Sequence, residues 1–105
     1  MEKYLEMVKE YDSNPDVELV EVLSHKLAST LADSDASSVA CSDDSELQTV
    51  KTNLLKNKLD VEGQEADDAI SYVCEEMKDQ NRKNRLVFYY LLIQKLGLKD
   101  KYVNS

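Results

Sequence analysis

Five residues near the C-terminal end of the sequence have the types and the spacing to bind an anion. They are four basic residues and one tyrosine, namely Lys78, Arg82, Lys83, Arg85 and Tyr89. The basic residues lie just before and at the start of a predicted helix, where free backbone N–H groups favour a phosphate or a carboxylate. Tyr89 follows Arg85 by one helical turn, so the two side chains can stack and attract a nucleotide or an RNA base. This pattern predicts a small anion-, nucleotide- or RNA-binding site.

A structural role competes with this anion site. Basic side chains at the N-terminus of a helix oppose its partial positive charge, at a cost of roughly a few tenths of a kcal/mol each. Lys78 and Arg82 can instead stabilise the C-terminus of the preceding helix, and Lys83 and Arg85 can pair with acidic residues elsewhere in the fold. We favour the structural role for the cluster and keep the anion site as the alternative.

The sequence offers no catalytic constellation and no metal site. His25 is the only histidine and is predicted to lie on the exposed face of a helix. There is no G-x-S-x-G, no glycine-rich phosphate loop and no H-E-x-x-H pattern. Asp33, Asp35 and Ser37 fit the first positions of a calcium-binding EF-hand loop, but Ser38 stands where that loop needs glycine. We therefore expect no enzymatic activity, no metal and no cofactor.

The two cysteines, Cys41 and Cys74, form no C-x-x-C pair and cannot make a zinc site without further ligands. Cys74 falls in the apolar stripe of a predicted helix, so we expect a buried and inert thiol. A disulfide would require an oxidising compartment, and the residues from Met1 to Tyr4 lack the features of a signal peptide. We therefore expect free thiols and a cytoplasmic protein.

The charge of the chain is unevenly distributed. The 105 residues include 21 acidic and 13 basic side chains, for a net charge of -8. Residues 1–76 carry 19 acidic and 6 basic residues, whereas residues 77–105 carry 2 acidic and 7 basic residues. This acidic body repels duplex DNA, so nucleic acid is an unlikely partner, although the basic C-terminal quarter can still attract an acidic partner or a phosphate.

Hydrophobic periodicity predicts a single all-α domain over residues 1–105. The chain has only two glycines and one proline, too few for a sheet with many tight turns. Apolar residues recur at helical spacing in five segments, which end at capping or turn residues. The predicted helices run from about Glu2 to Tyr11, Pro15 to Ala32, Asp43 to Lys58, Gln64 to Gln80 and Lys83 to Leu96.

The last of these helices is the expected centre of a compact array. The run from Leu86 to Ile93 is apolar throughout, and Gly97 followed by Leu98 is typical of a helix end. A helix that is apolar nearly all round belongs in the middle of a bundle, and eight apolar residues are too few to cross a bilayer. If one face of this helix is exposed, we expect it to carry Lys83, Val87, Tyr90 and Gln94.

Several short motifs resemble a family of small bacterial proteins known only as a domain of unknown function. They are Asp35-Ala36-Ser37 with Val39, Ser42-Asp43, Lys58-Leu59, Val73-Cys74-Glu75, Met77-Lys78, and Arg85 followed by Phe88-Tyr89-Tyr90-Leu91-Leu92. The family pattern prefers glycine after Lys58-Leu59, where this chain has Asp60. The resemblance implies an all-helical fold and assigns no catalytic or binding residue.

These observations favour a non-catalytic protein-interaction module that binds another protein or itself. The reasons are the missing catalytic constellation and the polarised charge. The alternative is a small anion-, nucleotide- or RNA-binding protein that uses the basic cluster. No membrane association is expected.

Overall fold

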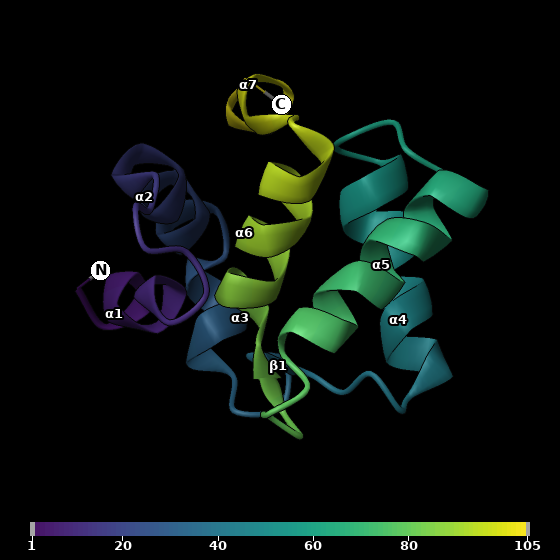
Figure 1. Ribbon diagram of the computed structural model, residues 1–105, viewed down its shortest axis with the longest axis horizontal. Helices are drawn as coiled ribbons and strands as arrows, with labels where there is room; N and C mark the ends of the chain where they lie inside the picture. Colours follow the sequence, from purple (N-terminus) through teal and green to yellow (C-terminus); the bar gives the residue numbers. More distant parts are fainter. Residues whose placement is uncertain (1, 105) are drawn as a thin grey trace.

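A computed structural model of the chain describes residues 2–104. In this range, seven α-helices pack against one another (Figure 1). In chain order the elements are α1 (Glu2–Lys9), α2 (Val17–Lys26), α3 (Ala28–Ala32), β1 (Ser38–Val39), α4 (Asp44–Val50), the π-helical segment η1 (Lys51–Lys56), α5 (Gln64–Glu76), β2 (Lys83–Asn84), α6 (Arg85–Leu96) and α7 (Lys99–Val103). The predicted all-α class is confirmed. Within residues 2–104 no helix has the length and apolar character needed to span a bilayer.

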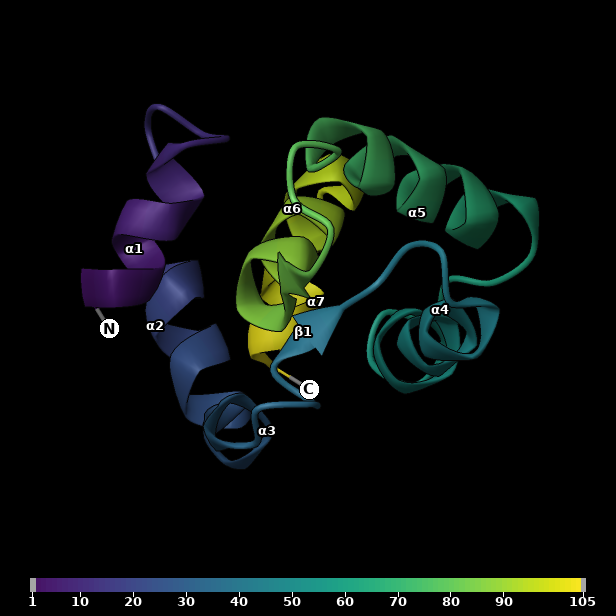
Figure 2. The same cartoon turned by 90° about the horizontal axis from the view of Figure 1, so that it is seen from below.

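Helix α6 is the centre of the fold, as its composition predicts. Figures 1 and 2 show α1 and α2 on one side of α6, and α4 and α5 on the other. The central position follows from burial of apolar surface, since each fully buried large side chain contributes about 1.5–3 kcal/mol. The buried residues of this helix are Arg85, Leu86, Val87, Phe88, Tyr89, Tyr90, Leu92 and Ile93.

The exposed face of α6 differs from the prediction. Lys83, Val87 and Tyr90 are buried, whereas Gln94 is exposed as predicted, together with Lys95. The Tyr90 hydroxyl donates to an Asp12 carboxylate oxygen at 2.6 Å and accepts from the Asp16 backbone N–H at 2.8 Å. Tyrosine is stable in this position because its ring packs in the core while its hydroxyl pairs with the loop between α1 and α2.

Helix α6 begins at Arg85, two residues later than predicted, and ends where the sequence indicates. The Asn84 side chain accepts the Val87 backbone N–H at 3.2 Å and so caps the helix. At the other end Gly97 is left-handed, with φ of 68°, and the Leu98 N–H donates to the Ile93 carbonyl at 3.1 Å. This pattern is a Schellman motif, in which glycine adopts positive φ without the steric cost of a Cβ atom.

The two residues before α6 form a short strand that sequence analysis missed. Lys83–Asn84 pairs antiparallel with Ser38–Val39, with Val39 opposite Lys83. No strand was predicted at either segment, so this pair is an addition to the predicted all-α fold. Two-residue strands carry no alternating pattern long enough to detect, so only the tertiary structure shows the pair.

Two predicted helices contain irregularities. The helix predicted from Pro15 to Ala32 starts at Val17, with Asp16 as its cap, and breaks at Leu27 into α2 and α3. The helix predicted to end near Lys58 continues from α4 into η1, whose wider turn brings two consecutive leucines into the core. These leucines are Leu54 and Leu55.

A disulfide joins Cys41 and Cys74, so the expectation of free thiols is wrong. Cys41 follows β1, whereas Cys74 lies in α5, and the two are 33 residues apart in the sequence. Both side chains are only partly buried. Neither the cellular compartment nor the helical pattern of the sequence indicates that the loop after β1 and α5 lie side by side.

Replacing Asp60 by glycine is expected to raise the free energy of unfolding by about 0.5 kcal/mol. Asp60 is the one non-glycine residue with positive φ (56°) among those described, and its carboxylate is largely exposed. Glycine removes the Cβ strain of this backbone conformation. Chemical denaturation of Asp60→Gly and of the matched control Asp60→Ala measures the effect. A glycine variant less stable than the alanine variant would contradict it.

Candidate functional site

Arg85, the first residue of α6, is buried in a cradle of polar groups. Its side chain is only 6% exposed. Its Nε donates to the Ala36 carbonyl at 2.6 Å, and one Nη donates to the Tyr89 hydroxyl at 3.3 Å. The other Nη donates to the Ser38 carbonyl at 3.4 Å and forms an ion pair with Glu46. The burial of this cation is therefore compensated by an ion pair and by backbone acceptors.

Two segments that are distant from α6 in the sequence build this cradle. The loop before β1 and the strand itself supply the carbonyl groups of Ala36 and Ser38, and α4 supplies Glu46. Tyr89 lies one turn along α6, with its ring 5.7 Å from the Arg85 guanidinium carbon. The predicted contact between Arg85 and Tyr89 is thus present in the structure, and it lies inside the fold rather than on its surface.

The other members of the basic cluster bond to groups outside the set that holds Arg85, although Arg82 reaches the hydroxyl of the same Ser38. Lys78 is exposed and forms an ion pair with Glu75 at 3.0 Å. The Arg82 guanidinium donates to the Ser38 hydroxyl at 2.8 and 3.0 Å. Lys83 is buried and donates to a backbone carbonyl. The structure therefore does not assemble the five predicted residues around one cavity, and a shared anion site formed by all of them remains a prediction.

A cleft of about 470 Å³ opens beside Arg85 and Tyr89, and we refer to it as the Arg85 cleft. Three basic side chains line it, those of Lys26, Lys58 and Arg85. Tyr102 joins Tyr89 in its lining, and among residues 2–104 no acidic side chain lines it. An acidic protein thus has a cleft whose lining charges are all basic.

The other lining residues are both polar and apolar. Leu27 and Leu54 supply apolar surface, while Thr30, Thr49 and Asn53 supply hydroxyl and amide groups. The Thr49 hydroxyl donates to a carbonyl of its own helix at 3.0 Å, which leaves its oxygen as an acceptor. The lining therefore offers donors, acceptors and apolar contact to one ligand.

Tyr102 brings the C-terminal helix to the cleft as a neutral phenol. Burial, and then the neighbouring Tyr89 hydroxyl, raise the pKa of Tyr102 to about 12. The Lys26 ammonium lies 5.5 Å from the centre of the Tyr102 ring, a cation–π distance. Helix α7 is tied to α2 because Lys99 bonds the Asp16 carboxylate at 2.8 Å. Tyr102 is therefore neutral at neutral pH and does not repel an anion.

Sequence reasoning found two residues of this cleft and missed the rest. Lys26, Lys58 and Tyr102 come from separate helices or turns, and nothing in their local spacing relates them to Arg85. Among residues 2–104 no group of three or more histidine, cysteine or acidic side chains is placed to hold a metal ion.

The fold and the cleft together define a small all-α domain with a basic and aromatic cleft beside its central helix. The chain belongs to the family described as "Protein of unknown function (DUF2853)", which matches residues 3–100. The resemblance seen in the sequence motifs is thereby confirmed. A search of curated proteins gave no match.

Proposed function

We propose that this protein is a non-catalytic binding protein for a small organic anion, which it holds in the Arg85 cleft. One observation carries the proposal. Within the part of the chain that the structure describes, three basic and no acidic side chains line the cleft, although the chain as a whole has a net charge of -8. A concave site with one sign of charge concentrates ligands of the opposite sign. Its volume of about 470 Å³ falls in the range typical of small-molecule sites.

The lining restricts the chemistry of the ligand. Four of the five N–H donors of Arg85 are used within the protein, so Arg85 offers at most one donor to a ligand. The exposed ammonium of Lys58 is then the main contact for a carboxylate or a phosphate. An apolar or ring-shaped body fits against Leu27 and Leu54. A small carboxylate or phosphate ester with an apolar part meets these requirements.

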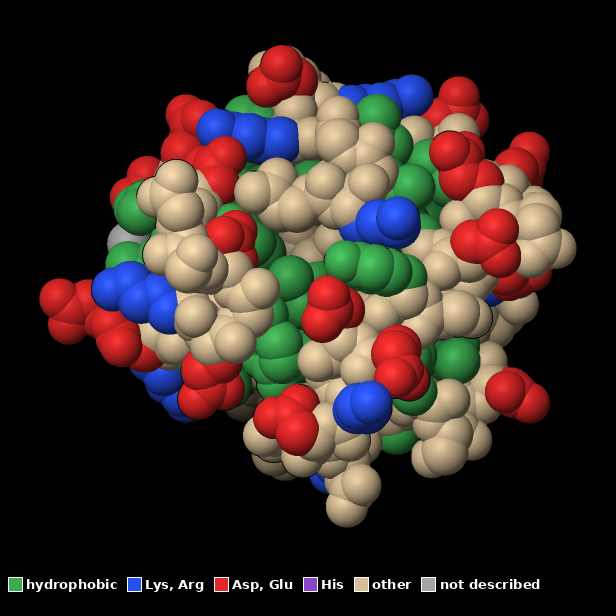
Figure 3. Space-filling model, in the orientation of Figure 1, with side chains coloured by type: hydrophobic (Ala, Val, Ile, Leu, Met, Phe, Trp, Pro, Cys, Tyr) green, Lys and Arg blue, Asp and Glu red, His purple; other side chains and the backbone are tan. Residues whose placement is uncertain are grey.

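A protein-interaction module is the second candidate. Figure 3 shows acidic side chains distributed over one face of the molecule, with apolar patches between them. Two large apolar side chains are markedly exposed, Val17 at 48% and Tyr72 at 45%. The Lys95 ammonium lies 4.5 Å from the Tyr72 ring centre, which gives that patch an amphipathic character suited to an interface. Self-association or a protein partner in sedimentation experiments would support this candidate.

The cytoplasmic location inferred from the sequence stays a prediction. The disulfide requires that the two cysteines meet an oxidant in whichever compartment the protein occupies.

A residue-resolved NMR titration tests the proposed cleft. The probes are inorganic phosphate, adenosine monophosphate and benzoate, at low and at physiological salt. We expect saturable amide shifts at Lys58, Arg85, Tyr89 and Tyr102, which weaken with salt because screening reduces the attraction. Lys58→Glu should weaken the affinity for a bound probe by about tenfold or more, since it reverses the charge at the mouth of the cleft.

Lys56→Glu is the matched control. Lys56 is also exposed and lies two residues away, but it does not line the Arg85 cleft. If Lys58→Glu and Lys56→Glu bind the probe with equal affinity, the Arg85 cleft is not the binding site. A titration with no saturable shift for any of the three probes would remove anion binding of this class.

A further inference from the structure

Lys83 is a buried cation without an acidic partner. Its side chain belongs to a residue that is 5% exposed, and its ammonium forms one hydrogen bond, to the Gln80 carbonyl. No carboxylate lies within ion-pair distance of this ammonium in the part of the chain that the structure describes. Burying a charge is costly unless it is paired, so this arrangement calls for a reason.

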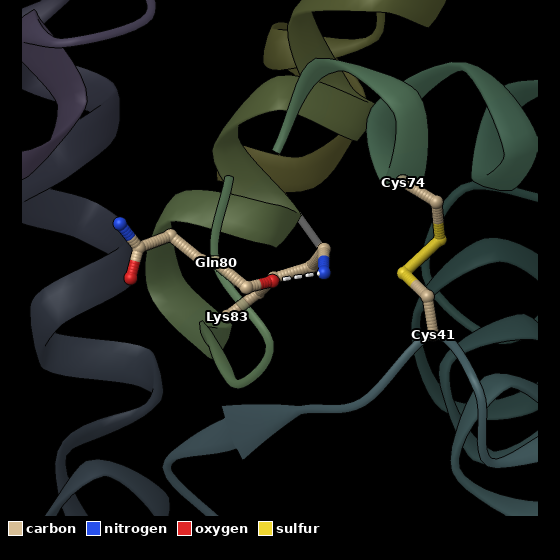
Figure 4. The surroundings of a disulfide bond; sticks show 4 residues. All are labelled: Cys41, Cys74, Gln80 and Lys83. Atoms are coloured by element: carbon tan, nitrogen blue, oxygen red, sulfur yellow. Dashed lines mark hydrogen bonds between the residues drawn. A yellow bond between two sulfur atoms is a disulfide. The ribbon is translucent and has the colours of Figure 1, made fainter. Parts of the chain in front are cut away.

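The disulfide lies on the side toward which the Lys83 side chain extends. Figure 4 shows the Lys83 side chain in the surroundings of Cys41 and Cys74, extending toward the side of the disulfide while its nitrogen bonds the Gln80 carbonyl. The strand register also brings Lys83 close to Cys41 in the backbone, because Lys83 pairs with Val39 and Cys41 follows Val39 by two residues. The cation and the disulfide therefore belong to one local site.

The disulfide lies at the edge of the hydrophobic core. Cys41 and Cys74 are both only partly buried, whereas the core residue Val73 beside Cys74 is fully buried. A partly exposed position beside a cation is the environment of reactive cysteines, because the cation stabilises the thiolate form. A purely structural disulfide in an apolar core has neither feature.

We propose that Cys41–Cys74 is a redox-active disulfide that exchanges with a dithiol, and that Lys83 stabilises the thiolate released when it opens. One thiolate of the dithiol attacks a sulfur of the disulfide, forms a mixed disulfide and expels the other cysteine as a thiolate next to Lys83. The second thiolate of the dithiol then attacks the dithiol sulfur that is bonded to the protein in the mixed disulfide. This step releases the remaining cysteine as a thiolate. Two electrons pass to the protein, and the dithiol leaves as its disulfide.

Alkylation of the reduced protein tests this proposal. The protein is reduced with dithiothreitol, the reagent is removed, and the rate of reaction with iodoacetamide is followed by mass spectrometry from pH 5 to pH 10. Lys83→Met should slow alkylation at pH 7 by about tenfold and move the midpoint of the pH profile up by about one unit. Lys83→Arg keeps the positive charge and should retain a profile close to that of the parent protein.

Lys9→Met is the control, because Lys9 is exposed and pairs with Glu6 in α1, away from the cysteines in sequence. The parent protein provides a second test that needs no folded variant. The midpoint of its pH profile of alkylation should be lower in buffer than in concentrated urea. Equal midpoints, or equal profiles for Lys83→Met and Lys9→Met, would overturn the proposal. Failure of dithiothreitol to open the disulfide without denaturant, or loss of the helical signal on reduction, would also overturn it.

Discussion

Replacing Arg85 by methionine is expected to lower the free energy of unfolding by about 3 kcal/mol. The substitution keeps side-chain volume but leaves the partly buried Glu46 carboxylate without its cation, and it removes the donors to Ala36 and Ser38. Each orphaned group then carries a desolvation cost that no hydrogen bond offsets. Denaturant unfolding followed by circular dichroism measures the loss.

Two variants separate the charge effect from general damage. Arg82→Met removes an exposed guanidinium that bonds only the Ser38 hydroxyl, so its cost should stay below about 1 kcal/mol. In Arg85→Met/Glu46→Leu the unpaired carboxylate is also removed, and the double variant should be more stable than Arg85→Met alone. An Arg85→Met variant as stable as Arg82→Met would show that the cradle contributes little to the fold.

Removing the disulfide with Cys41→Ser/Cys74→Ser is expected to cost about 3–4 kcal/mol. The bridge closes a loop between residues 33 positions apart, and breaking it restores conformational freedom to the unfolded chain. The loss is a large fraction of the 5–15 kcal/mol that stabilises an ordinary domain, so the variant should fold but melt earlier. Thermal and urea unfolding under oxidising conditions measure it.

The same measurement with a reductant is the control. Dithiothreitol should lower the stability of the parent protein to that of the double serine variant and leave the variant unchanged. Equal stabilities under oxidising conditions would contradict the expected contribution. Amide hydrogen exchange measures the local effect on this loop. In the sequence, Cys41 lies between Ser38 and Glu46, which both bind Arg85. The loop that carries Cys41 should exchange faster in the variant.

The Arg85 substitution and the loss of the disulfide affect neighbouring parts of the structure. The segment from Ala36 to Glu46 provides the acceptors for Arg85, and Cys41 in its middle is fixed to α5. Arg85 in turn forms part of the wall of the proposed anion cleft. The disulfide therefore restrains a loop on which the geometry of the cleft depends.

Local signals in the sequence predicted the all-α class and the central helix, but they missed α7 and the break between α2 and α3. The apolar run before Gly97 predicted the central helix and its end, since side-chain pattern and glycine at positive φ act over a few residues. The same reasoning placed the start of that helix two residues early, because Lys83 and Asn84 pair with a strand far away in the chain. Local pattern carries no information about that pairing.

The candidate site was predicted only in part. Arg85 and Tyr89 were found because they lie one helical turn apart, which is a local relation. Their role inside the fold depends on Glu46, and the rest of the cleft depends on Lys26 and Lys58 from other elements. No spacing in the sequence links these residues.

The sequence by itself determined the all-α class, the central helix and the acidic charge of the molecule, because hydrophobic periodicity, helix ends and composition are properties of short segments. Only the tertiary structure decided that Cys41 meets Cys74, that Glu46 meets Arg85, and that basic side chains surround one cleft. These are contacts between residues far apart in the chain. They are set by how the helices pack around α6, and helix packing is the joint result of all the side chains in the core.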